Sequence, residues 1–199
     1  MNEKLKAIHT NIQWINLENE QVLRVEKNEK IDRFDENTIV LFEEEQPFHN
    51  GIIEVKMRSR LLPDAPDFAR GFIGIVFRSK QDGSEFESYY VRPTNGNHPD
   101  PVRRAHGSQY FSYPGYTFAY FREFGIDGYE APVNIQLDEW IAVKAVIMNE
   151  KATFYVQDMD HPVLEVIDLK HGADASGAVG LYVDTGTEGF FKDWKIKRF

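Results

Sequence analysis

The stretch Gly71-Phe72-Ile73-Gly74-Ile75-Val76-Phe77 decides the fold class of this 199-residue chain. Its apolar side chains occupy both alternating faces, a pattern typical of a strand that is covered on each side. We therefore expect the central strand of a layered β-structure here. Gly71 and Gly74 would allow a neighbouring element to approach closely, which favours a structural role for them over a ligand-binding one.

Short β-type segments, broken by Gly, Pro, Asn and Asp, flank this stretch on both sides. Residues 51–58 alternate between apolar and charged side chains, which indicates an antiparallel strand with one dry face. Only Asn149 and Glu150 separate the strands expected over 140–148 and 152–157, so these two strands should form a hairpin. Further strands are expected, among them 102–111 and 117–124. The pattern predicts an all-β fold made of two antiparallel sheets.

The chain shows no internal repeat or linker, so we expect one domain over residues 1–199. Its first part, residues 1–20, lacks a clear strand signal. There the residues Leu5, Ile8, Ile12 and Ile15 are spaced as on one helical face, so this part is expected to be an irregular or weakly helical lead-in.

The composition and net charge of the chain exclude or disfavour several kinds of site and partner. The chain has no cysteine, which excludes disulfides and thiolate metal sites, and its net charge of -9 disfavours nucleic acid and anionic membranes as partners. It also lacks the run of about 20 apolar residues that a membrane-spanning helix needs. Because no apolar segment follows Met1, no signal peptide is expected, which predicts a cytoplasmic protein unless a leader was trimmed from it. The overall charge favours a neutral or cationic partner.

Five segments, in their order along the chain, resemble the concanavalin A-like lectin and glucanase superfamily. They are 48–55, 71–77, 139–144 (Glu-Trp-Ile-Ala-Val-Lys), 177–183 (Gly-Ala-Val-Gly-Leu-Tyr-Val) and 191–196 (Phe-Lys-Asp-Trp-Lys-Ile). The uneven spacing in the last segment suggests a bulge. The resemblance implies a two-sheet, laminin-G-like jelly-roll sandwich. Within the superfamily the chain looks most like uncharacterised bacterial domains in which Arg-Pro-Thr-Asn-Gly is followed by Arg-Arg-x-His, here residues 92–96 and 103–106.

The segments 89–100 and 102–110 hold the densest mixture of polar and aromatic residues. Guanidinium and amide groups beside tyrosine rings suit an oligosaccharide or another polyhydroxy ligand, because hydroxyls need planar donors while the C–H face of a sugar packs on a ring. The candidate ligand-binding residues are Tyr90, Arg92, Asn95, Arg104, His106 and Gln109. The alternative is a hydrogen-bonded hairpin in which the arginines pair with nearby carboxylates.

A second aromatic run, residues 110–121, surrounds a Pro-Gly turn. Tyr113 and Tyr116 would make a stacking platform at the rim of the site if they are exposed together. If they are buried, they fill space between the sheets.

Glycoside hydrolysis would need two carboxylates on either side of a cleft. Glu85 and Glu87 are the candidates, with His106 or Tyr90 as the proton-handling partner, because residues two apart on a strand share a face. However, the related glucanases carry Glu-x-Asp-x-x-Glu on one strand, and residues 85–90 read Glu-Phe-Glu-Ser-Tyr-Tyr. The catalytic pattern is not met, and a solvated strand face is the alternative.

The six histidines are scattered, so no metal site is predicted and no cofactor is evident, although the resemblance leaves calcium open at acidic turns such as 158–161. Three function hypotheses follow. The first is a carbohydrate-binding or carbohydrate-active domain, the second is a glycoside hydrolase or lyase using Glu85 or Glu87, and the third is a protein-interaction module without a small ligand. The sequence leaves the oligomeric state open.

Overall fold

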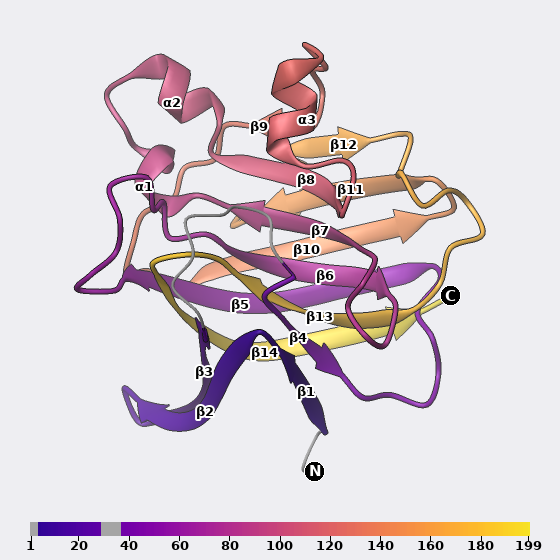
Figure 1. The fold of residues 1–199 in the computed structure, drawn as a ribbon, viewed down its shortest axis with the longest axis horizontal. Coiled ribbons are helices and arrows are strands. Elements are labelled where there is room, and N and C mark those ends of the chain that lie inside the picture. Colours follow the sequence, from indigo (N-terminus) through magenta and orange to yellow (C-terminus); the bar gives the residue numbers. More distant parts are fainter. Residues whose placement is uncertain (1–3, 29–36) are drawn as a thin grey trace.

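The computed structural model describes residues 4–28 and 37–199. In these residues the strands form two antiparallel sheets of seven strands each, packed face to face (Figure 1). The first sheet has the order β1-β4-β13-β6-β7-β8-β9, and the second has the order β12-β11-β10-β5-β14-β3-β2. The predicted all-β sandwich of two antiparallel sheets is confirmed.

The first sheet contains β1 (Leu5–Ile8), β4 (Ile39–Phe42), β13 (Ala178–Val183), β6 (Ile73–Ser79), β7 (Phe86–Val91), β8 (Ser108–Tyr113) and β9 (Glu130–Ala131). The second contains β12 (Leu164–Val166), β11 (Lys151–Val156), β10 (Ile141–Met148), β5 (Gly51–Leu61), β14 (Thr187–Arg198), β3 (Glu20–Lys27) and β2 (Thr10–Leu17). Three short helices of the described chain, α1 (Pro93–Gly96), α2 (Pro101–Ala105) and α3 (Phe118–Glu123), lie on the β8 side of the first sheet (Figure 1).

Strand β6 lies inside the first sheet, between β13 and β7, and every one of its residues is buried. Ile73, Ile75 and Phe77 face the core between the sheets, whereas Val76 faces outward. The space beside Gly74 is too small for a side chain, since an added Cβ would lie 2.2 Å from the carbonyl oxygen of Tyr89. The predictions of a central strand and of a structural glycine are confirmed.

The second sheet shows the expected hairpin and bulge. Strands β10 and β11 pair through the turn at Asn149 and Glu150. In β14 the register to β5 shifts between Lys192 and Lys195, where Asp193 has a φ of 55°. The irregular spacing between Phe191 and Trp194 is therefore a bulge, as predicted.

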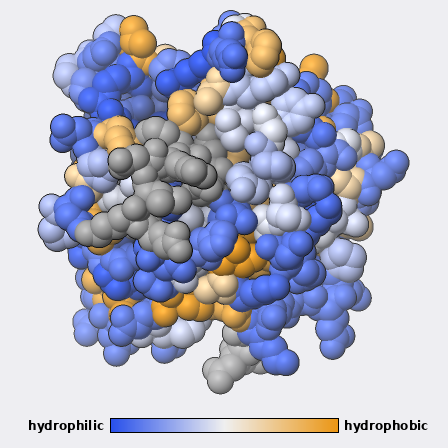
Figure 2. All heavy atoms as spheres, in the orientation of Figure 1, coloured by the Kyte–Doolittle hydropathy of each residue, from blue (hydrophilic) through white to orange (hydrophobic). Residues whose placement is uncertain are grey.

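The first sheet is buried on both faces. Besides the core between the sheets, a second cluster of buried apolar residues covers its outer face. The members of this outer cluster are Ile39, Leu41, Phe72, Val76, Phe86, Tyr90, Phe111, Ala178 and Tyr182. Figure 2, in the orientation of Figure 1, shows mainly hydrophilic residues around the rim of the molecule. A ligand site on this outer face can therefore combine apolar walls with a polar rim.

The expected lead-in is different in the structure. Residues 5–17 of the expected lead-in form β1 and β2 instead of helix or coil, while residues 1–3 lie outside the described residues. The apolar residues are spaced as on a helix because His9, with a φ of 50°, separates the two strands. The alternation of inward and outward side chains therefore starts anew in β2. Leu5 packs on the core and Ile8 on the outer cluster, as positions three apart in a strand must.

The two strands expected over 102–111 and 117–124 begin as helices. Pro101 stands at the first position of α2, and the Asp100 side chain caps this helix by accepting from the Val102 N–H at 2.9 Å. This Asp-Pro pair is a helix-start signal, and it overrides the apparent strand. The first segment enters a strand only at Ser108, where β8 (Ser108–Tyr113) begins, and Phe118–Glu123 of the second is α3.

Candidate functional site

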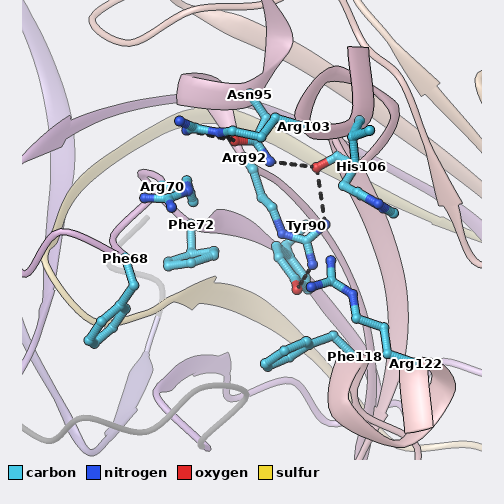
Figure 3. Close-up of a pocket in the computed structure, with 11 residues that line it drawn as sticks. Phe68, Arg70, Phe72, Tyr90, Arg92, Asn95, Arg103, His106, Phe118 and Arg122 are labelled. Atoms are coloured by element: carbon cyan, nitrogen blue, oxygen red, sulfur yellow. Dashed lines mark hydrogen bonds between the residues drawn. The ribbon is translucent and has the colours of Figure 1, made fainter. Parts of the chain in front are cut away.

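A pocket of about 340 Å3 opens on the outer face of the first sheet. Tyr90 comes from β7, the loop before β6 contributes three residues, and α1, α2, α3 and their flanking turns contribute the rest (Figure 3). The described lining residues are Phe68, Arg70, Phe72, Tyr90, Arg92, Asn95, Val102, Arg103, His106, Phe118 and Arg122. The predicted residues Tyr90, Arg92, Asn95 and His106 meet here, together with seven that the sequence did not single out.

Arg92 is the centre of a buried hydrogen-bond network. Its guanidinium donates to the Tyr90 hydroxyl at 2.6 Å, to Glu130 Oε1 at 2.7 Å and to the His106 carbonyl at 3.1 Å, and it also donates to Gln109. The Tyr90 hydroxyl donates to Gln109 Oε1 at 2.9 Å. Because these groups hold one another, the guanidinium is fixed in one orientation before any ligand arrives. Gln109 is fully buried behind the pocket and acts as a support.

Asn95 fixes the two short helices to each other. Its side-chain N–H donates to the His106 carbonyl at 3.0 Å, and its Oδ1 accepts from Arg103 at 3.1 Å and 3.3 Å. The side chain is buried, so the predicted residue serves the site by positioning Arg103 and the backbone at His106.

Glu130 is an acidic support that the sequence did not reveal. It belongs to the two-residue strand β9, where it pairs with Gln109 of β8. Its carboxylate bonds to Arg92, lies 2.7 Å from His106 Nδ1 and lies 3.4 Å from Arg122. A carboxylate on Nδ1 orients the ring, so that the Nε2 atom of His106 is the one left for a ligand.

Arg103 takes the place that the sequence gave to Arg104. In a strand, Arg104 and His106 would share a face, but in the helix α2 the neighbouring residue Arg103 turns into the pocket. Arg104 is exposed and donates to the His98 carbonyl at 3.0 Å. Arg104 therefore does not line this pocket, because the segment that was expected to be a strand is a helix here.

Tyr113 and Tyr116 do not form a common platform in this structure. Tyr113 is half-buried and stacks on Phe86, with ring centroids 5.1 Å apart. Tyr116 is exposed, packs edge-on against Tyr120 and lies under the Lys170 ammonium. Neither residue lines the pocket.

Glu85 and Glu87 do not share a face, contrary to the expectation for a pair of catalytic acids. Glu85 precedes β7, is exposed and pairs with Lys80 at 2.5 Å. Glu87 points into the sandwich, where it is fully buried and accepts from the Tyr110 hydroxyl at 2.8 Å and the His171 N–H at 3.2 Å. Burial raises the pKa of Tyr110 well above its usual value, and the nearby Glu87 adds to the rise. Both acids lie outside the pocket.

The acidic turns are explained by hydrogen bonds within the chain. Asp158 Oδ1 accepts from the N–H groups of Asp160 and His161, and Asp82 Oδ1 accepts from Ser84. Among residues 4–28 and 37–199, no group of three or more His, Asp or Glu side chains gathers in a way that could hold a metal ion. In the same residues no helix is long and apolar enough to cross a membrane.

The position of α1 depends on Gly96. An added Cβ at this residue would lie 2.1 Å from the carbonyl oxygen of Ile135. We predict that Gly96→Ala lowers the free energy of unfolding by about 1–3 kcal/mol through overpacking and weakens ligand binding, since α1 carries Asn95. Gly115→Ala is the matched control because no atom lies within 4 Å of its added Cβ. Equal thermal stability of the two variants would contradict this account of α1.

The sequence matches no protein-family model and no curated protein. Several solved structures have a similar fold. The carbohydrate-binding module CBM66 from Bacillus subtilis has a TM-score of 0.61 at 13% identity, with 96% of both chains covered. A protein of unknown function with a galectin-like fold, also from Bacillus subtilis, has a TM-score of 0.55 at 11% identity, covering 98% of this chain and 89% of that one.

A third similar structure is the exoplasmic/lumenal domain of VIP36 in its Ca2+/Man3GlcNAc-bound form. Its TM-score is 0.51 at 7% identity, with 96% of this chain and 85% of that one covered. At these identities the likeness concerns the backbone arrangement alone. The chain has a two-sheet jelly-roll sandwich fold similar to theirs.

Proposed function

We propose that this chain is a carbohydrate-binding domain and that its ligand occupies the pocket on the outer face of the first sheet. The observation that carries the proposal is the lining of this pocket, where four aromatic rings stand beside fixed guanidinium, amide and imidazole groups (Figure 3). Among the structures of similar fold, CBM66 is named for carbohydrate binding and VIP36 was solved with Man3GlcNAc. Those names support the proposal without specifying a sugar for this chain.

The aromatic rings supply the apolar part of the site. Phe68 and Phe118 are partly buried, and the Arg122 guanidinium carbon lies 5.3 Å from the Phe118 ring centroid, while Phe72 and Tyr90 form the buried base. The C–H face of a sugar ring packs on such surfaces in preference to remaining in water. Figure 3 shows Phe68 and Phe118 at one end of the pocket and Arg103 at the other. A ligand spanning the pocket would therefore contact both kinds of group.

The polar groups are held in place before binding. Arg92 and Asn95 both donate to the His106 carbonyl, and Arg103 donates to Asn95 Oδ1. A site that is already ordered loses little conformational entropy when the ligand binds, which raises affinity for a given set of contacts. The volume of about 340 Å3 lies at the lower end of the usual range of about 300–1,000 Å3 for small-molecule pockets, which suits a short oligosaccharide or a chain end.

Binding is favoured over hydrolysis by the acids that are present. A glycosidase of the common kind needs two carboxyl groups beside the bond that is cleaved. The described lining of the pocket contains no Asp or Glu, and the adjacent Glu130 is engaged by Arg92, His106 and Arg122. The described part of the pocket accordingly offers groups that hold a ligand and contains no pair of acids that would cleave one.

A pair of phenylalanines from the α3 region tests the site. We predict that Phe118→Ala weakens oligosaccharide binding about 2- to 10-fold, because the ring contact is worth about 0.5–1.5 kcal/mol. Phe124→Ala removes an exposed ring outside the pocket, so its affinity should equal that of the wild type. A glycan array identifies ligands for the wild type, and isothermal titration calorimetry compares the variants.

Two results would count against this proposal. One is a folded wild type that retains no glycan, which would favour the protein-interaction alternative. The other is an equal loss of affinity in Phe118→Ala and Phe124→Ala, which would show that the ligand does not bind in the pocket.

The rim of the visible face is mainly hydrophilic, unlike the extended apolar patch that a protein-docking surface often shows (Figure 2).

A further inference from the structure

The charge of the pocket is opposite to that of the chain. Four arginines line it, and none of its described lining residues is acidic, although the whole chain has a net charge of -9. Arg92 and Arg122 both reach the single carboxylate of Glu130. The other two, Arg70 and Arg103, therefore decide what the pocket attracts.

Arg70 and Arg103 have no carboxylate partner among the described residues. Arg70 donates to the carbonyl oxygens of Asp67 at 2.6 Å and Ala69 at 2.8 Å. Arg103 donates to Asn95, lies 2.9 Å from His98 Nε2 and reaches Thr94 at 3.5 Å. Their hydrogen-bond partners are neutral oxygens and an imidazole nitrogen, so the positive charges are oriented without being neutralised.

This pattern differs from the rest of the described chain. Every other arginine there that is buried or half-buried lies within 4 Å of a carboxylate oxygen. These arginines are Arg24, Arg58, Arg60, Arg78, Arg92 and Arg198. Removing a guanidinium from water is costly unless an anion accompanies it. Arg70 and Arg103 are the exceptions, and both line the same pocket.

The two groups also affect each other electrostatically. Burial lowers the pKa of Arg70, and the positive charges of Arg103 and Arg92 lower it further. Figure 3 shows Arg70 and Arg103 at the same end of the pocket, beside Phe72. An anionic group placed between them would offset both the burial and the repulsion.

We propose that the ligand is an acidic carbohydrate, a sugar whose ring carries a carboxylate or a sulfate ester, with the anionic group held between Arg70 and Arg103. This inference rests on the proposed carbohydrate-binding function and specifies its ligand class. The guanidinium fork matches a planar carboxylate or a sulfate through paired hydrogen bonds. The sugar ring then lies toward Phe68 and Phe118, the two partly exposed rings.

Calorimetric titration of the full chain with four probes tests this inference. Two probes are acidic sugars, trigalacturonate and a sulfated disaccharide, the third is an uncharged counterpart of these sugars, and the fourth is inorganic sulfate alone. Measurements at 0.15 M salt screen the distant acidic residues, because the Debye length there is about 8 Å. The acidic sugars should bind at least about 10-fold more tightly than the uncharged sugar, since hydrogen bonds to charged groups are the strong ones. The better of the two acidic probes identifies the anion.

Matched arginine variants complete the test. Arg70→Gln and Arg103→Gln should each weaken binding of the acidic sugar by about 10- to 100-fold and weaken binding of the uncharged sugar by a much smaller factor. Arg104→Gln, which removes the neighbouring exposed charge on the same helix, should change neither. Circular dichroism confirms that each variant is folded.

The contradicting outcomes separate the two proposals. Equal affinity for acidic and uncharged sugars, unchanged in Arg70→Gln and Arg103→Gln, overturns the acidic ligand and leaves carbohydrate binding in place. Inorganic sulfate that binds as tightly as the acidic sugars makes the pocket a simple anion site and also overturns the inference. Absence of binding by every sugar defeats both proposals together.

Discussion

Replacing Arg92 by Met is expected to remove ligand binding and to lower the free energy of unfolding by about 2–5 kcal/mol. Arg92 is 4% exposed, and its loss would leave Tyr90, Gln109 and Glu130 without their shared donor. Buried polar groups that lose a partner carry the full cost of leaving water. The same substitution removes the group that aligns Tyr90 and the backbone at His106, so the pocket loses its geometry.

Urea denaturation and calorimetric titration measure the two effects of Arg92→Met. Arg92→Lys serves as the comparison, because it keeps the positive charge and loses the planar fork. We expect Arg92→Lys to recover part of the stability and little of the binding. A stability within about 1 kcal/mol of the wild type for Arg92→Met would show that the network is not a structural unit.

The second large effect is expected in the core between the sheets. Phe154 of β11 is fully buried and stacks on Tyr89 of the opposite sheet, with ring centroids 4.2 Å apart at an interplanar angle of 5°. Phe154→Ala should therefore lower the free energy of unfolding by about 3–5 kcal/mol, the usual cost of deleting a buried phenylalanine ring. Urea denaturation, followed by tryptophan fluorescence, measures this loss.

Tyr155 on the same strand provides the control for Phe154→Ala. It faces outward and is half-buried, with the Lys144 ammonium 3.9 Å from its ring centroid. Tyr155→Ala should cost only about 1 kcal/mol, through the lost cation–π contact and a weaker strand preference. If the two variants were equally destabilised, the sandwich core would lie elsewhere. Folded Phe154→Ala should still bind ligand, because the pocket lies on the other face of the first sheet.

The strands with the clearest alternation could be predicted from the sequence. In β5 the apolar residues Ile53, Val55 and Met57 are buried, as the period of two requires. The apolar run in β6 indicated a strand buried on both faces, and it is. These features depend on local pattern alone. The register between strands and the division into two sheets depend on contacts distant in sequence, so the resemblance to known sandwiches carried that part.

Four of the eleven described residues that line the site could also be predicted. Tyr90, Arg92, Asn95 and His106 lie within one segment, so their proximity followed from the chain itself. Arg70, Phe118 and Glu130 reach the same place from other parts of the fold, which no local pattern shows. Glu130 in particular belongs to a strand of two residues. This strand is too short to show the alternation of apolar and polar residues by which a strand is recognised in a sequence. The Asp100-Pro101 pair was the one available signal that 101–105 is helical.

The net charge of the chain and the charge of the pocket favour different ligands. The value of -9 favoured a neutral or cationic partner, because it sums charges over the whole surface. A bound group responds chiefly to charges within a few ångströms, where the pocket presents four guanidinium groups. The acidic sugar proposed above would therefore differ from the partner that the net charge favours.

The outer face of the second sheet carries a groove that is the alternative place for a ligand on this chain. The groove is lined by Lys56, Asp193, Trp194, Lys195 and five further residues. Like the pocket of the first sheet, it combines an aromatic ring with charged side chains. Its charges are already matched, since Lys56 pairs with Asp193 at 2.9 Å. We expect this groove to remain unaffected by the ligand of the first sheet.

The most direct test of the central claim is a 1H–15N NMR titration of the full chain with trigalacturonate, or with the glycan that the array identifies. We expect the largest chemical-shift changes in the Nε–Hε signals of Arg70 and Arg103 and in the backbone amides of residues 90–107. Shifts concentrated instead on the Trp194 indole and its neighbours, with the arginine signals unmoved, would place the ligand on the second sheet and contradict the account.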